Sequence, residues 1–529
     1  MVNEDFYHLL LNLMLFVPLL GIAVLLALPK ASAKYVALVF SLVSFVLSLV
    51  VFKGYLAVSG QQLSAQDGGY VFYRAFEMAQ GTFLEGYDIK YILGIDGISI
   101  YLILLTTLLF PLSIWFSFSS VHKMDKGYYA LLLLLMTSVM GVFMSLDLVL
   151  FYIFFELGLI PMYFLIGIWG GKDRIYAALK FFLYTLAGSV LLLLAVIYLG
   201  LKVGPHVSPD LLFTSDLSTL MHYLFDPGSP AALSWNEQYW LFLGFAISFA
   251  IKVPVFPVHT WLPDAHVQAP TAGSVILAGV LLKMGTYGLI RFCLPLFPEA
   301  SAYFAPAASI LALIGIIYGA MAAMVQTDIK KLVAYSSVAH MGFVVLGIFA
   351  MTAEAMSGAV LQMVNHGIST GALFLIVGMI YDRRHTREIK DFQGIAKQMP
   401  IFTLFFMIAT MSSIGLPGLN GFVGEFLILL GSFGSGLMER WVIVVATTGV
   451  ILAAVYMLWM FRRVMFGTLD KEENKTLQDL NGTEIAILIP LTVLMFVIGF
   501  HATPFLEQIN VSSDYVVRLV NDSLSNYGG

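Results

Sequence analysis

Ionisable side chains interrupt the long apolar segments of this sequence, and four of them lie close to a segment's middle. They are Glu156 in the run 147–168, Lys283 in 271–294, His340 in 331–350 and His366 in 357–380. A charge at the centre of a bilayer costs roughly 2.5–3.5 kcal/mol on insertion scales, so such residues are rare without a function. Carboxylates, amines and imidazoles can each take up and release a proton. The set therefore predicts proton transfer along a chain of side chains at mid-depth.

Four further candidates lie beside helix-breaking stretches or nearer to a segment end. They are Lys252 and His259 around a first break, Glu425 after a second break, and Lys180 in the run 175–200. We predict that all eight residues belong to the proton path. No cofactor-binding and no metal-binding residue is expected in this chain.

Each candidate also has a structural interpretation. Glu156 could form a buried salt bridge that only fixes helix packing. Lys180 could extend its ammonium to the membrane surface, whereas Lys283 lies too deep for that. The histidines could be ordinary hydrogen-bonded core residues. Near the run ends, cap or loop contacts are expected of four further residues, namely Asp147, Asp264, His266 and Asp328.

The energy for such transport has no visible source in this chain. Moving one charge across 200 mV costs roughly 4.6 kcal/mol, which separation of a buried Glu–Lys pair could supply. The sequence has no P-loop GxxxxGK[ST] and no dinucleotide-binding fingerprint after a strand. A partner must therefore provide the driving force.

The composition dictates the elements that position these residues. Of 529 residues, 60% are hydrophobic and only 11% are charged, and the mean hydropathy is +0.90. Soluble domains carry about 25% charged residues, so this is an all-α polytopic membrane protein. The net charge of −5 gives no sign of a nucleic-acid partner. The single cysteine, Cys293, excludes an internal disulfide and a cysteine-ligated iron–sulfur cluster.

About fourteen runs are long and apolar enough to cross a bilayer, which takes ~20 residues. The runs are 10–28, 35–56, 92–119, 127–145, 147–168, 175–200, 239–258, 271–294, 304–325, 331–350, 357–380, 400–431, 440–461 and 485–505. The first run begins with Glu4 and Asp5 instead of a basic segment, so it is expected to be a span and not a signal peptide.

Lys and Arg predict the orientation. If both termini lie outside, the inner loops hold 17 of these residues and the outer segments 7. The segments 57–90 and 201–238 are then outer capping loops. The most basic inner loop, 381–399, is either a positive-inside anchor or a docking surface for a neighbouring subunit.

Two runs are expected to be broken helices. The run 239–258 contains Pro254 and Pro257, and the run 400–431 contains Pro417 among glycines. Broken helices at corresponding places point to an ion pathway. The offset of five spans predicts two inverted five-helix units, although prolines placed by chance remain an alternative. The predicted divisions are 1–126 (three helices), 127–295 and 296–463 (the two units), and 464–529 (a helix and tail).

Four long motifs carry a family resemblance. They are FFELGLIPMYFLIGIWGG (154–171), FAIKVPVFPVHTWLPDAHVQAPTAGSVILAGVLLKMGTYGLIRF (249–292), QTDIKKLVAYSSVAHMGFVVLGI (326–348) and GLNGFVGEFLILLGSF (418–433). The sequence resembles the antiporter-like (Mrp-type) subunits of respiratory complex I, an NADH–quinone oxidoreductase, and within them the subunit M branch. The resemblance covers essentially all spans.

The resemblance implies a role for each site residue. Glu156 matches the glutamate that pairs with a lysine, Lys252, and Lys283 matches the lysine of the eighth span. His340, His366 and His259 match the family's histidines, and the position of Lys180 is basic there too. Glu425 matches an acidic residue at which transfer across the subunit ends; the L and N branches have lysine at that position.

The resemblance also implies the setting. The chain would be a proton-translocating subunit in the bacterial cytoplasmic (inner) membrane, between L-like and N-like subunits and among lipids. Flavin, iron–sulfur clusters, NADH and quinone would be bound by partner subunits. The alternatives are the D-type component of an Mrp-type multisubunit Na⁺/H⁺ antiporter, a membrane subunit of an energy-converting hydrogenase, and a purely structural scaffold.

Overall fold

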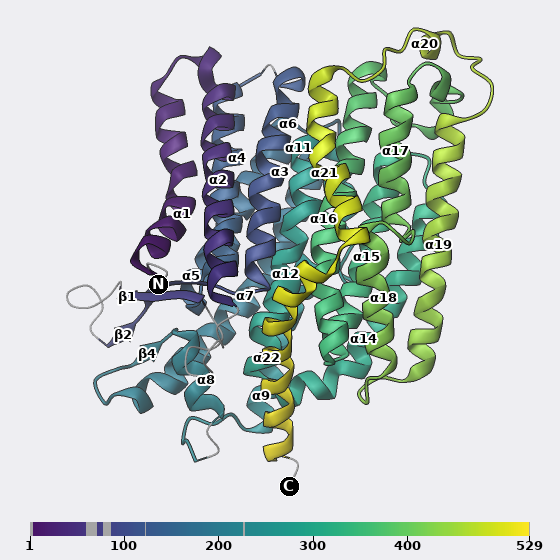
Figure 1. Ribbon diagram of the computed structural model, residues 1–529. Helices are drawn as coiled ribbons and strands as arrows, with labels where there is room; N and C mark the ends of the chain where they lie inside the picture. The colour runs from purple at the N-terminus through teal and green to yellow at the C-terminus, as the bar shows by residue number, and fades with distance from the viewer. Residues whose placement is uncertain (1–3, 60–70, 78–85, 122, 226–227, 528–529) are drawn as a thin grey trace.

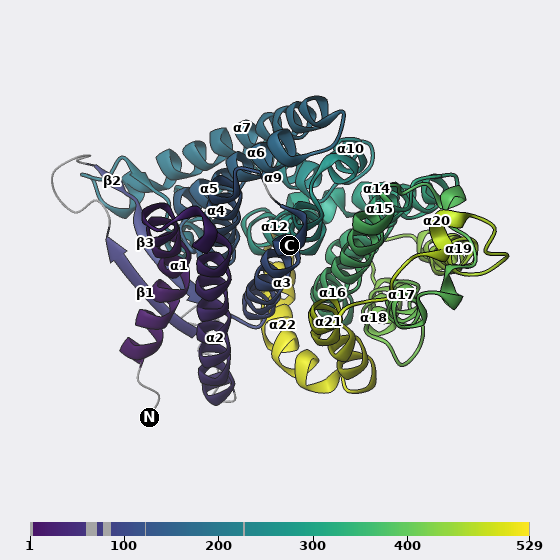
Figure 2. The same cartoon turned by 90° about the horizontal axis from the view of Figure 1, so that it is seen from above.

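The structure is a computed structural model that describes residues 4–59, 71–77, 86–121, 123–225 and 228–527. Its helices run side by side as one bundle, with α1 (Glu4–Ala27) and α2 (Ala33–Ser59) at one edge and α19 (Arg440–Met465) at the other (Figure 1, Figure 2). The first part continues with α3 (Ser99–Ser120), α4 (Asp125–Met144), α5 (Leu148–Leu157), α6 (Leu159–Trp169) and α7 (Arg174–Val207).

The remaining helices complete the bundle. The middle part holds α8 (Leu217–Phe225), α9 (Trp235–Lys252), α10 (Trp261–Gln268), α11 (Thr271–Ile276), α12 (Leu282–Gly288), α13 (Leu294–Leu296) and α14 (Pro298–Met324). The last part holds α15 (Ile329–Phe349), α16 (Ala353–Arg384), α17 (Pro400–Ser413), α18 (Asn420–Phe433), α20 (Glu472–Lys475), α21 (Gly482–Phe500) and α22 (Thr503–Tyr527).

Twelve helices in the described part of the chain are long and apolar enough to cross a membrane. They correspond to twelve of the fourteen expected runs. The other two expected runs are the ones predicted to break, and both are interrupted: in the run 239–258, α9 ends at Lys252, and in the run 400–431, α17 is separated from α18. The all-α membrane fold is thereby confirmed, whereas the inverted repeat and the four divisions of the chain remain predictions.

The three most buried membrane-spanning segments carry Lys283, His340 and His366. The most apolar stretches of Thr271–Leu296, Ile329–Phe349 and Ala353–Arg384 are 100%, 94% and 100% buried. By contrast, α1 and α21 are 39% and 28% buried over the same length. α16 packs against α15, α17, α18, α11 and α3, and therefore forms the axis of the bundle (Figure 2). Lys283, His340 and His366 thus lie away from lipid.

The segments expected to be outer capping loops contain regular structure. Val71–Glu77 (β1) pairs antiparallel with Lys90–Ile95 (β3), and Tyr87–Asp88 (β2) pairs parallel with Phe213–Thr214 (β4). These strands, α8 and the C-terminus lie at the lower end of the bundle in Figure 1, and α20 lies at the upper end. The C-terminal tail is also ordered, because it forms α22, which packs against α16, α14 and α13.

The basic segment 381–399 makes many contacts within its own chain. Arg383 forms a bidentate ion pair with Glu484 at 2.6 Å for both contacts, and Arg387 pairs with Asp328 at 3.3 Å. These partners bind the segment to α21 and to the start of α15. Part of its positive charge is therefore neutralised inside this chain.

Candidate functional site

Four buried side chains from four helices form a continuous row through the middle of the bundle. The amine of Lys283 lies 2.6 Å from Nδ1 of His366, and the rings of His366 and His340 are 5.8 Å apart between centroids. Nδ1 of His340 then lies 2.8 Å from Oε1 of Glu425. All four side chains are at most 4% exposed. The sequence-predicted residues of the eighth, tenth, eleventh and twelfth spans are thus brought together.

Lys283 is placed by an irregular helix. π-helical turns at Leu277–Leu281 and Leu289–Cys293 flank α12, and such turns are frequent at functional sites. The Lys283 ammonium donates a hydrogen bond of 2.5 Å to the carbonyl of Ala278, five residues earlier. The same ammonium contacts His366, so it is held between a backbone dipole and an imidazole.

Glu425 lies in the second turn of α18, close to the break that precedes this helix. The positive end of a helix favours a carboxylate near its N-terminus. The Gln362 amide donates a hydrogen bond of 3.1 Å to Oε1 of Glu425, the same oxygen that meets His340. Gly415 has φ +74°, and a side chain there would lie 3.2 Å from Oε2 of Glu425. The break therefore provides both the helix end and the space for the carboxylate.

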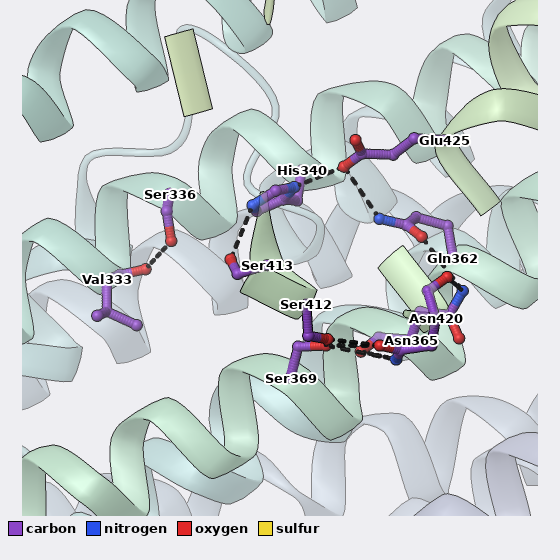
Figure 3. A network of polar contacts seen from close by, with 10 residues as sticks. All are labelled: Val333, Ser336, His340, Gln362, Asn365, Ser369, Ser412, Ser413, Asn420 and Glu425. Carbon is purple, nitrogen blue, oxygen red and sulfur yellow. Dashed lines mark hydrogen bonds and ion pairs between the residues drawn. The ribbon is translucent and has the colours of Figure 1, made fainter. Parts of the chain in front are cut away.

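Amides and hydroxyls hold the second break in place (Figure 3). Asn420, the first residue of α18, accepts a 2.7 Å hydrogen bond at its carbonyl from the Asn365 amide. Its side-chain oxygen accepts a hydrogen bond from the Ser412 hydroxyl, which lies 2.5 Å from the Ser369 hydroxyl. The Ser413 hydroxyl lies 3.3 Å from Nε2 of His340. These residues fix both half-helices to α16 and support the histidine; of them, only Asn420 is singled out by the sequence, as part of the second break.

Little free space adjoins the histidines. A cavity of about 10 Å³ is lined by His340, His366 and Ser413 among others. A single water molecule needs at least about 10–15 Å³, so this space is at the limit for one water. Proton transfer between the two rings would therefore require that water or a small movement.

Glu156 and Lys252 form an open pair in the first half. Lys252 ends α9 at the first break, where unsatisfied carbonyls favour a cation. Its ammonium lies 4.7 Å from the centroid of the Phe155 ring and has no hydrogen-bond partner among the described residues. Oε1 of Glu156 is also buried and, in the same described ranges, without a partner. The two charges interact, but no ion pair within 4.0 Å joins them in that part of the chain.

Lys180 and His259 lie apart from the central row. Lys180 forms an ion pair of 2.7 Å with Asp264 of α10, so Asp264 contacts a helix partner and does not cap a helix end. His259 is 2% exposed and packs against Tyr318 and Phe256, with ring centroids 5.2 and 5.7 Å away. Asp147 and Asp328 are helix caps, as expected: each accepts hydrogen bonds from two backbone amides at the start of its helix.

His266 was expected to be a cap or loop contact, and the structure corrects this. Its ring is completely buried and stacks on Phe374 at 4.6 Å, and neither ring nitrogen has a partner in the described ranges. Its neighbour Val267 lines the same cavity as Lys330. The motif HTWLPDAH contains His266 as well as His259, and this second histidine in the motif is the signal that could have marked His266 as a buried residue.

A cavity of about 590 Å³ opens near His266 at the end of the bundle that carries the basic loop. Charged residues from helix ends and from the connections between helices line it, among them Lys172, Asp173, Lys330, Asp382 and Arg387. Lys330 is 5% exposed and donates a hydrogen bond of 2.6 Å to the carbonyl of Ala269. A volume of this size holds many waters, since each occupies about 30 Å³ in the liquid.

A metal ion has no evident place here: in the described ranges, no three His, Cys, Asp or Glu residues gather so that they could hold one. The site is instead a buried row of titratable groups between broken helices. Fold and site together define a membrane subunit of the antiporter type.

Comparison with known proteins gives the family. Residues 145–453 match the family model described as NADH:quinone oxidoreductase/Mrp antiporter, TM. The chain is 46% identical over 521 residues to NADH-quinone oxidoreductase subunit M of Rhodobacter capsulatus, with 96% of both chains covered. It is 41% identical to NADH-ubiquinone oxidoreductase chain 4 of Chondrus crispus, over 95% of this chain and 96% of that one. The chain therefore belongs to the NADH:quinone oxidoreductase/Mrp antiporter family of membrane subunits.

Solved structures agree with this assignment. A chain of respiratory complex I from Thermus thermophilus with bound NADH superposes with a TM-score of 0.82 at 30% identity, over 96% of this chain and 99% of that one. A chain of the Mrp complex from Dietzia sp. DQ12-45-1b has a TM-score of 0.77 at 20% identity, over 98% and 100%, which shows a shared fold. The resemblance to the subunit M branch of complex I is thus confirmed.

Proposed function

We propose that this chain translocates protons within an NADH–quinone oxidoreductase, driven by redox chemistry in partner subunits. One observation carries the proposal: Lys283, His366, His340 and Glu425 form a buried row, with hydrogen-bond contacts at both ends and neighbouring histidine rings between them. A scaffold would be better stabilised by apolar residues of similar volume, because isolated buried charges are costly. Such a row is useful where protons must move laterally.

The open Glu156–Lys252 pair would control the loading of this row. A carboxylate that approaches Lys252 stabilises its protonated form, and a carboxylate that withdraws favours release of the proton. Neither group is bound in a close ion pair in the described part of the chain, so a small movement changes their interaction strongly. The energy for that movement would come from a neighbouring subunit.

Protons would reach the row from the large cavity at the basic end of the bundle. Lys330 at its wall, then the buried His266, would connect water in the cavity to Lys283, since Val267 and Lys330 line the cavity and both ring nitrogens of His266 are buried without a partner among the described residues. The positive-inside distribution supports placing this end in the cytoplasm and both termini outside. We place the chain in the bacterial inner membrane, among lipids and between L-like and N-like subunits, which resemble its own fold. Flavin, clusters, NADH and quinone would be bound by partner subunits.

Replacement of single titratable residues in the assembled complex tests this function. In proteoliposomes of the purified complex, Lys283→Ala and Glu156→Gln should each lower NADH-driven proton uptake at least several-fold. Met284→Leu is the matched control, because it conserves volume beside Lys283 in the same helix and removes no titratable group. Assembled Lys283→Ala complex with the pumping rate of the control would overturn the proposal.

The alternative is a cation/proton antiporter subunit without redox coupling, and the family model covers both kinds of complex. The two are separated by the partners that co-purify with the chain. A complex with flavin- and cluster-bearing subunits supports redox-driven pumping. Sodium-driven proton movement in a complex without those subunits supports the antiporter.

A further inference from the structure

A buried ion pair joins the helix of Lys283 to the segment after β3, toward the end of the bundle that carries the strands. Arg291 and Asp96 form an ion pair of 2.6 Å, and both side chains are 4% exposed. Arg291 lies eight residues beyond Lys283, or about 12 Å along a helix. Tyr287 lies midway between them, so the three side chains share one helix face. A polar line thus extends from Lys283 toward the end with the strands.

The line is fixed firmly at its far end. Asp96 accepts backbone hydrogen bonds from Ile98 and Ser99, of 3.0 and 2.8 Å, while its other oxygen binds Arg291. Nε of Arg291 donates a hydrogen bond of 3.2 Å to the hydroxyl of Tyr287. The guanidinium therefore has partners on its own helix and on the segment between β3 and α3.

The C-terminal helix covers this pair. The Ser512 hydroxyl of α22 accepts a hydrogen bond of 2.8 Å from the backbone amide of Gly97, the residue after Asp96. A side chain at position 97 would overlap the carbonyl oxygen of Gln508, so glycine is required for this close approach. The ion pair is thus enclosed between the helix of Lys283, the start of α3 and α22.

We propose that Arg291, held by Asp96, is an electrostatic barrier that prevents protons on Lys283 from leaving toward the end with the strands. An arginine is charged at every accessible pH, so it cannot relay a proton and repels an approaching one. Asp96 compensates the cost of burying that charge. The direct contact of Lys283 within the row is His366, 2.6 Å away. The inference rests on the proposed function, since it explains why transfer is lateral.

Passive proton leak tests the barrier without any redox reaction. In sealed proteoliposomes of the whole complex, a potassium diffusion potential is imposed and proton entry is followed with an internal pH dye. The double variant Asp96→Asn with Arg291→Gln should raise the proton leak several-fold, because polar amides admit water and carry no charge. NADH–quinone turnover should persist while the proton-to-electron ratio falls.

Two controls identify the cause. Neutralising a partly buried arginine pair, by Arg383→Gln with Glu484→Gln, removes a helix junction elsewhere and should leave the leak at the wild-type level. Adding Lys283→Met to the double variant should abolish the extra leak if it passes through Lys283. An equal leak in both double variants would mean general loosening and would overturn the proposal.

The outcomes separate this inference from the proposed function. An assembled Asp96→Asn, Arg291→Gln complex with wild-type leak and stoichiometry overturns the barrier and leaves pumping through Lys283 intact. If that double variant does not assemble, Arg291→Gln alone is measured, because Asp96 keeps its two backbone donors. Failure of both variants to assemble would assign the pair a structural role and reject the barrier.

Discussion

The amine of Lys283 and Nδ1 of His366 lie 2.6 Å apart, although 83 residues separate them in the sequence. A hydrogen bond of this length requires that one of the two facing nitrogens offers a free lone pair, so either Nδ1 is unprotonated or the amine is neutral. The pair can therefore hold at most one proton between its two facing atoms. Lys283 and His366 therefore act as a single proton-binding site. We call this pair the station; a proton moves on from it only when His366 offers a protonated nitrogen to His340.

Removal of the imidazole should break the row at this station. We expect His366→Ala to slow proton transfer through this chain by about 100-fold, the lower end of typical general acid–base contributions. The measurement is NADH-driven quenching of a pH-gradient dye in proteoliposomes of the complex. His222→Ala is the control, because that histidine is exposed on α8, away from the row. Unchanged quenching in assembled His366→Ala complex would contradict the station.

Glu425 should be needed as an acid and not only as a hydrogen-bond acceptor. Glu425→Gln can still accept hydrogen bonds from His340 and Gln362 with its side-chain oxygen, but it cannot bind or release a proton. We expect normal assembly and strongly reduced pumping, whereas Glu425→Asp should retain part of the rate. Equal pumping by the glutamine variant and the wild type would leave Glu425 with a packing role only.

Gly415 should be intolerant of even a methyl group. Its φ of +74° costs a residue with a side chain about 1–2 kcal/mol, and the new Cβ would lie 3.2 Å from the Glu425 carboxylate. We expect Gly415→Ala to lower the thermal transition of the complex and to reduce pumping. Gly436→Ala is the matched control, since a Cβ there meets nothing within 4 Å. Similar behaviour of the two variants would show that the space beside Glu425 is not required.

Much of this site follows from the sequence, because a polar residue inside an apolar run has few uses in lipid. Hydropathy located the spans of Lys283, His340 and His366, and proline and glycine located the two breaks. The same reasoning predicts that buried charges converge, because each needs a partner away from lipid. The row from Lys283 to Glu425 is the geometry that this requirement produces.

Other contacts had no local signal. Arg291 pairs with Asp96, which lies 195 positions earlier, and no sequence spacing predicts that these two residues are partners. α22 escaped detection because its polar face lowers its hydropathy below that of a span. β1 and β3 pair across the end of a helical bundle, where periodicity over a few residues is too weak to predict strands. Long-range pairing depends on packing of the whole bundle, which no short segment contains.

Lys330 provides a last test, which concerns proton access from the large cavity. Its ammonium donates to the Ala269 carbonyl, and both residues line the cavity. We expect Lys330→Met to lower the pumping rate several-fold and Lys330→Arg to lower it as much, since arginine keeps the charge but cannot release its proton. Lys331→Met is the matched control, because it removes the neighbouring charge, which does not line the cavity. Equal pumping by the Lys330→Met and Lys331→Met variants would mean that protons reach His266 by another route.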